Sequence, residues 1–140
     1  MENRNIDTAR ISASAEKLSA KYDNLIIEGA GGLFVPLTED YLVIDYIKDN
    51  EYPVVLVTTP KLGSINHTLL SIEALASRGI ELRMLVYNLD LSTSKKITDD
   101  TLKILKRYLL KYGYAVSIII MDHFSISESA DINFDSLLRL

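Results

Sequence analysis

The stretch spanning residues 22–32 constrains this chain more than any other. An apolar run at 25–27 ends in the carboxylate of Glu28, and four small residues follow at 29–32. The run lacks polar alternation, which is typical of a parallel strand covered on both faces. In open α/β sheets, ligands bind beyond the carboxyl ends of the strands, and glycine lets a ligand approach the backbone closely. Glu28 is therefore a candidate metal or ligand residue, with the capping of a turn as the alternative.

A second signal of the same kind follows along the chain. Residues 54–59 predict another buried strand, which runs into the glycine-containing loop at 60–66. A helix is predicted over 65–78. Because the free N–H groups at the start of a helix favour an anion, this loop is a candidate binding site. Capping of the helix by Ser64 or Asn66 is the alternative interpretation.

The rest of the chain continues the alternation of helices and apolar strands. The further predicted elements are a helix over 7–22 capped by Asp7 or Thr8, a short helix over 41–48, a strand over 82–87 ending at Asn88, a helix that Thr98 caps and Gly113 stops, and a strand over 115–121. The segments 29–38, 90–96 and 122–130 are expected to be loops, with a helical turn over 134–138. Such alternation favours an α/β fold with a parallel sheet, and we expect a single domain over 1–140.

Composition narrows the function. The formal net charge of -4 argues against a nucleic-acid binder, which usually has a basic face. The absence of cysteine excludes disulfides and thiolate zinc sites. The N-terminal residues lack the apolar core of a signal peptide, and no apolar run approaches the length that spans a membrane. We therefore expect a cytoplasmic protein that binds neither nucleic acid nor membrane.

The two glycine-containing segments together resemble dethiobiotin synthetase. In that family a strand ending in Glu-Gly-Ala-Gly-Gly, here 28–32, precedes Lys-Leu-Gly-x-Ile-Asn-His, here 61–67, in this order and at this spacing. The resemblance covers about residues 11–89. It implies a P-loop NTPase-like, Rossmann-like layered fold. It also implies the ATP- and Mg²⁺-dependent closure of a ureido ring on 7,8-diaminopelargonate with carbon dioxide, a step of biotin biosynthesis.

The resemblance assigns roles to particular residues. Glu28 would bind Mg²⁺, and Gly29, Ala30 and Gly31 would border the nucleotide and the substrate carbamate. Asn88 would read the adenine base. The residues implied to bind the substrate carboxylate are Leu62, Gly63, Ser64, Ile65 and Asn66. In the family this helix start reaches across a dimer interface, so the resemblance implies a homodimer whose active site lies at the interface.

The sequence also departs from the family pattern. The family begins with a strand and a phosphate-binding G-x-x-x-x-G-K-[ST] loop, and this motif does not occur in the 140 residues. The chain is therefore interpreted as the C-terminal portion of such an enzyme, inactive by itself, with a gap, a rearrangement or an exposed edge in its sheet. A Gly-x-Ile-Pro segment of the family is replaced here by Met-Asp-His-Phe at 121–124.

Two alternatives stay open at this point. The first is a non-catalytic remnant that dimerises or binds small carboxylates. The second is a related amidoligase of the cobyrinate amide synthase type, which shares the Glu-Gly-Ala-Gly strand end. The motif at 61–67 speaks against the second alternative.

Overall fold

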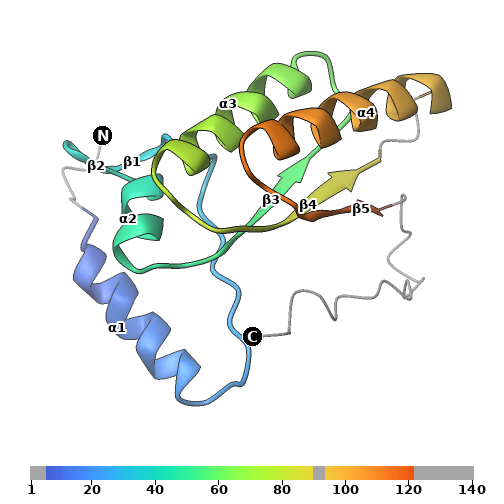
Figure 1. Ribbon diagram of the computed structural model, residues 1–140. Helices are drawn as coiled ribbons and strands as arrows, with labels where there is room; N and C mark the ends of the chain where they lie inside the picture. The colour runs from blue at the N-terminus through green and yellow to red at the C-terminus, as the bar shows by residue number, and fades with distance from the viewer. Residues whose placement is uncertain (1–5, 90–93, 122–140) are drawn as a thin grey trace. The chain divides into compact units, whose positions relative to one another are not determined.

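The computed structural model describes residues 6–89 and 94–121 (Figure 1). The chain divides into two compact units, Met1–Asn50 and Glu51–Leu140. The elements of the first unit are α1 (Thr8–Ser19), β1 (Pro36–Thr38), β2 (Tyr41–Leu42) and α2 (Val43–Asp49). Those of the second are β3 (Val54–Thr58), α3 (Ser64–Ser77), β4 (Leu82–Asn88), α4 (Lys95–Lys111) and β5 (Ser117–Met121). None of the helices in the described ranges is both long and apolar enough to cross a membrane.

The first unit joins two helices and a small antiparallel ribbon. Asp7 caps α1, as predicted, because its side chain accepts a hydrogen bond from the Arg10 N–H at 3.2 Å. The hydroxyls of Ser12 and Tyr46 lie 3.3 Å apart and connect α1 with α2. Strands β1 and β2 pair antiparallel. They occupy the end of the predicted loop at 29–38 and the start of the predicted helix at 41–48, so both predicted boundaries are corrected.

The strand predicted over 25–27 is wrong for the described structure. These residues adopt no regular secondary structure, and the side chains of Ile26 and Ile27 are 92% and 43% exposed. An apolar run becomes a strand only when a neighbouring strand accepts its backbone hydrogen bonds. Within residues 6–89 and 94–121, no strand pairs with this run. Its composition therefore indicated a burial that the described structure does not provide.

The second unit is a layered α/β structure. Its strands form a parallel sheet in the order β3-β4-β5, with Leu56 opposite Leu85 and Leu85 opposite Ile118. Helices α3 and α4 lie against one face of this sheet (Figure 1). The predicted α/β class with a parallel sheet is thereby confirmed. The buried apolar residues of this unit are Val54, Ile72, Ala74, Leu75, Ile80, Leu82, Met84, Leu85, Val86, Tyr87, Leu105 and Leu109.

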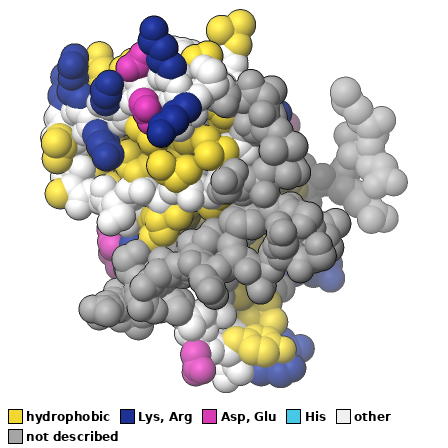
Figure 2. Space-filling model, turned by 90° about the vertical axis from the view of Figure 1, so that its right-hand side faces the viewer, with side chains coloured by type: hydrophobic (Ala, Val, Ile, Leu, Met, Phe, Trp, Pro, Cys, Tyr) yellow, Lys and Arg dark blue, Asp and Glu magenta, His cyan; other side chains and the backbone are white. Residues whose placement is uncertain are grey.

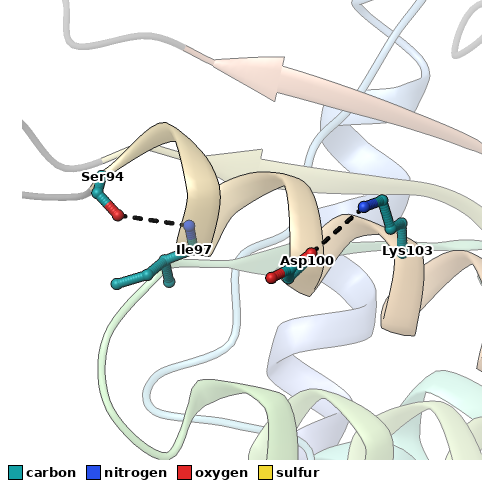
Figure 3. A network of polar contacts seen from close by, with 4 residues as sticks. All are labelled: Ser94, Ile97, Asp100 and Lys103. Carbon is teal, nitrogen blue, oxygen red and sulfur yellow. Dashed lines mark hydrogen bonds and ion pairs between the residues drawn. The ribbon is translucent and has the colours of Figure 1, made fainter.

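Helix ends in this unit follow the sequence closely, with one exception. Gly79 and Gly113 each follow the residue that caps the C-terminal end of α3 or α4, and they have positive φ angles of 66° and 86°, as expected for glycines that end helices. The exception is the start of α4, which Ser94 caps by accepting a hydrogen bond from the Ile97 N–H at 3.4 Å (Figure 3). The predicted cap, Thr98, lies inside the helix and is 8% exposed.

Ser94 lies one turn before Thr98 and caps the helix there. The helix therefore begins one turn earlier than predicted. The same helix carries an ion pair between Lys103 and Asp100, whose Nζ and Oδ1 atoms lie 3.3 Å apart (Figure 3). Of the loop predicted over 90–96, residues 90–93 lie outside the described residues. The predicted loop at 122–130 and the helical turn at 134–138 lie outside them as well.

The outer face of α4 collects positive charge. Figure 2 shows several Lys and Arg side chains gathered around hydrophobic ones in the upper part of this view. The basic residues of α4 are Lys95, Lys96, Lys103, Lys106, Arg107 and Lys111. Leu109 and Leu105 on the opposite side are only 2% and 1% exposed, so the helix is amphipathic and its basic side is the solvated one.

Candidate functional site

The turn between β3 and α3 forms the first part of the candidate site. Gly63 precedes the helix in the left-handed conformation, with φ 86° and ψ -11°, and contributes no side-chain cap. The alternative in which Ser64 or Asn66 caps the helix is therefore wrong. The Ser64 N–H donates to the Lys61 carbonyl at 3.0 Å. The N–H groups of Ile65 and Asn66 belong to the first turn, where a helix supplies no acceptor, and they remain available to an anion.

A cavity of about 210 Å³ lies beside this turn. One wall consists of consecutive residues of β3 and its continuation, and the other is a stripe of α3 at helical spacing. The lining residues are Leu56, Val57, Thr58, Thr59, Ser64, His67, Thr68 and Ser71. Most of these side chains are polar, and five of them carry hydroxyl groups. Because hydroxyls both donate and accept hydrogen bonds, the cavity suits a small polar ligand.

Two buried hydroxyls hold the cavity walls together. The hydroxyl of Thr68 donates to the Ser64 carbonyl at 2.7 Å, and the hydroxyls of Thr58 and Thr68 lie 2.6 Å apart. Because a carbonyl only accepts, the single hydroxyl proton of Thr68 is committed to Ser64. The oxygen of Thr68 must then accept the proton of Thr58. This chain of hydrogen bonds ties the carboxyl end of β3 to the first turn of α3.

The predicted substrate-binding residues lie together at this turn. Leu62 is fully exposed, whereas Ser64 and Ile65 are half-buried at the helix start. Asn88 ends the neighbouring strand, one residue after Tyr87, which stands opposite Thr58 in the register. It is exposed, and the Leu89 N–H donates to the Met121 carbonyl at 2.8 Å directly after it. Asn88 and the start of α3 therefore occupy the same end of the sheet.

Glu28 and the residues that follow it belong to the first unit. Glu28, Gly29 and Ala30 are exposed in a stretch without regular secondary structure. Gly31 has a φ of 89°, and a Cβ at this position would lie 2.8 Å from the Val35 Cγ2 atom. Both the backbone angle and the space therefore require glycine at this position. The loop is held to the start of α2 by the Val43 N–H, which donates to the Val35 carbonyl at 3.0 Å.

The donor set of this segment bears on a metal ion. Within the described ranges, no group of three or more His, Asp or Glu side chains forms a protein cage for a metal. A single exposed carboxylate such as Glu28 fits Mg²⁺, because this ion keeps several waters and is often shared with substrate phosphates. Glu28 does not fit an ion that needs a complete set of protein ligands.

The cavity contains residues that were not predicted to contact a ligand. His67, Thr68 and Ser71 line it, although the sequence assigned them no binding role. The available signal was the recurrence of polar side chains at positions 64, 67, 68 and 71 of the helix. This spacing places them on one stripe. Thr58 and Thr59 gave a weaker signal as the only polar residues of their strand and its continuation.

Comparison with known proteins identifies the family. Residues 1–118 match the family model described as an AAA domain, so the chain belongs to this family. The chain is 42% identical over 126 residues to an ATP-dependent dethiobiotin synthetase of Pasteurella multocida, a match that covers 90% of this chain and 59% of the relative. It is 43% identical over 120 residues to an ATP-dependent dethiobiotin synthetase of Chlorobaculum tepidum, covering 86% and 50%.

A Haemophilus influenzae enzyme of the same name is 52% identical over 87 residues, covering 62% of this chain and 46% of the relative. These relatives confirm the predicted resemblance to dethiobiotin synthetase. The chain spans about half the length of the curated relatives that it matches, since the three matches cover 59%, 50% and 46% of them.

Proposed function

We propose that this chain contributes to dethiobiotin synthesis, the ATP- and Mg²⁺-dependent closure of a ureido ring on 7,8-diaminopelargonate with carbon dioxide. The name of the relatives supports an ATP-dependent dethiobiotin synthetase activity. The observation that carries the proposal is the start of α3. There the left-handed Gly63 opens a helix whose first N–H groups lack intrahelical acceptors, next to a polar cavity.

The proposed roles follow from the position and chemistry of each group. The N–H groups of Ile65 and Asn66 hold the substrate carboxylate at the positive end of the helix dipole. Gly63 lets the chain enter the helix in the left-handed conformation, and Leu62 and Ser64 flank the bound carboxylate. Asn88 reads adenine, because its amide accepts from the exocyclic amino group and donates to the neighbouring ring nitrogen.

In the first unit, Gly29, Ala30 and Gly31 let the nucleotide and the substrate carbamate approach the backbone. Glu28 would hold Mg²⁺, which supplies the positive charge that offsets the charge of the triphosphate. The reaction needs positioned groups more than a nucleophilic side chain. One substrate amine takes up carbon dioxide as a carbamate, and the carbamate oxygen attacks the γ-phosphate and displaces ADP. The second amine then attacks the activated carbamate carbon, which closes the ring and expels phosphate.

The proposal includes a homodimer that completes the site at the start of α3, and a cytoplasmic location. It also includes inactivity of this chain by itself, because the sequence holds no G-x-x-x-x-G-K-[ST] loop to bind the triphosphate. The same observation favours one second candidate, a module that binds small carboxylates without turnover. A measurement of substrate binding tests the shared part of both candidates, and nucleotide binding separates them.

Two glycines that flank α3 provide a matched pair of variants. Gly63 and Gly79 stand at its two ends with φ angles of 86° and 66°, and a Cβ would meet nothing within 3.9 Å at either position. Each substitution by alanine therefore introduces a comparable backbone strain of roughly 1–2 kcal/mol. We expect Gly63→Ala to weaken the binding of 7,8-diaminopelargonate at least about fivefold, because it shifts the N–H groups of the first turn. Gly79→Ala should bind the substrate as tightly as the unmodified chain.

Calorimetry with 7,8-diaminopelargonate measures these affinities, and amide chemical shifts of Ile65 and Asn66 report where the carboxylate binds. Equal affinities for the two alanine variants would contradict the proposed site. The same preparation is then titrated with ATP and Mg²⁺ and assayed for dethiobiotin. Nucleotide binding with no product supports a partial synthetase, whereas substrate binding without nucleotide binding supports the carboxylate-binding module.

A further inference from the structure

The imidazole ring of His67 lies beside the start of α3. The His67 N–H donates to the Gly63 carbonyl at 3.1 Å, so this residue closes the first turn of the helix. Side chains of a helix tilt toward its N-terminus, which directs the ring back along that turn. A Cβ built on Gly63 would lie 4.0 Å from the His67 Cε1 atom. The ring therefore reaches the residue at which the chain enters the helix.

The same ring lines the cavity between β3 and α3, and the charges around this cavity favour an anion. Among the described residues that line it, none is acidic, and His67 is the one that can carry a positive charge. Strand β3 consists of uncharged residues. The other ionisable side chain of α3 is Glu73, which is exposed and does not line the cavity. In the loop that joins the two elements, the exposed Lys61 adds a further positive charge.

We propose that His67 contacts the substrate carboxylate and, when protonated, strengthens its binding, so that affinity rises as the pH falls. This inference rests on the proposed function, which places the carboxylate at the N–H groups of Ile65 and Asn66. A charged imidazole is disfavoured beside the positive end of a helix dipole until an anion occupies the same position. Anion binding and protonation of His67 therefore favour one another, and each makes the other stronger.

The test uses the full chain and hexanoate, a monocarboxylate that lacks the amines of the substrate and stays ionised near neutral pH. Amide chemical shifts of Ile65 and Asn66 measure its dissociation constant at about pH 8 and at about pH 6, a range in which imidazoles change charge. We expect the dissociation constant to fall about threefold at the lower pH, which is the scale of an exposed ion pair. An equal dissociation constant at both pH values would overturn the inference.

Two variants of His67 separate the effect of its charge from that of its shape. His67→Gln is uncharged at both pH values and should bind hexanoate as weakly as the unmodified chain does at the higher pH. His67→Lys is charged at both pH values and should bind equally tightly at both. Glu73→Gln is the control on the same helix, outside the cavity, and should retain the pH dependence. A His67→Gln variant that keeps the pH dependence of the unmodified chain would assign it to another group and overturn the inference.

The same titrations separate a failure of this inference from a failure of the proposed function. If hexanoate moves the amides of Ile65 and Asn66 with the same affinity at both pH values, the carboxylate site is supported and the role of His67 is wrong. If neither hexanoate nor 7,8-diaminopelargonate moves these amides at either pH, the carboxylate site itself is wrong, and the inference fails with it.

Discussion

The hydrogen bonds between Thr58, Thr68 and Ser64 predict an asymmetric response to mutation. Thr68→Val keeps the shape of the side chain but removes both the acceptor of the Thr58 proton and the donor to the Ser64 carbonyl. Thr58 is only 7% exposed, so its hydroxyl has little access to bulk water. A buried donor left without an acceptor costs about 1–3 kcal/mol of unfolding free energy, and we expect Thr68→Val to lose this amount.

Thr58→Val removes a donor but leaves no hydroxyl proton without an acceptor, because the hydroxyl of Thr68 still donates to the Ser64 carbonyl at 2.7 Å. The loss is then that of one ordinary hydrogen bond, about 0.5–1.5 kcal/mol. In the double variant both hydroxyls are replaced by methyl groups and no orphaned donor remains. The double variant should therefore be no less stable than Thr68→Val alone, although it carries two substitutions.

Urea unfolding followed by circular dichroism measures the four members of this double-mutant cycle. We expect Thr68→Val to lose more unfolding free energy than Thr58→Val. The reverse order would show that Thr58 is the acceptor and that the proton directions inferred from the Ser64 carbonyl are wrong. Strictly additive losses would show that the two hydroxyls do not form a hydrogen bond.

Three further predictions concern other sites. Burial and the hydrogen bond to Asp49 raise the pKa of Tyr41 to about 12, so the stability that its protonated form contributes is fully present below about pH 10 and is lost as the pH rises toward 12. Tyr41→Phe should therefore remove the component of a tyrosinate absorbance titration that appears near about pH 12. Gly31→Ala should lower the unfolding free energy by about 1–2 kcal/mol or more in urea, whereas Gly32→Ala, which meets nothing within 4 Å, should not. The buried Tyr87 hydroxyl has no hydrogen-bond partner among the described residues, so Tyr87→Phe should leave stability unchanged or raise it by about 1 kcal/mol in the same assay.

The second unit was predictable because its signals are local and agree with one another. The apolar run over 82–87 coincides with β4, and the glycines at 79 and 113 stand where α3 and α4 end. Parallel strands and crossover helices require long, continuous patterns, which the sequence shows clearly. The start of α4 was missed because Ser94 and Thr98 both carry hydroxyls that can cap a helix. The choice between them depends on how far the helix can extend, which propensity does not decide.

The run over 25–27 shows the opposite case. Its composition predicted a strand as strongly as that of β3, yet only β3 has a hydrogen-bonded neighbour among the described residues. Strand formation is a property of two segments, and the sequence of one segment does not contain its partner. The glycines of the candidate site could be predicted because the backbone conformation there favours glycine, and glycine is visible directly in the sequence. The hydroxyls of the cavity were missed because serine and threonine occur in helices for many reasons.

The two kinds of site residue should therefore respond differently when stability and binding are measured on the same variants. Thr68 both lines the cavity and fixes the first turn of α3, so its substitution should lower unfolding free energy and substrate affinity together. Gly63 acts only through the direction in which the chain enters the helix. The strain of Gly63→Ala equals that of Gly79→Ala, so any affinity that only the former loses must come from the N–H groups of the first turn. A loss of affinity that merely tracked stability across all three variants would mean that the helix start is a structural turn and not a binding site.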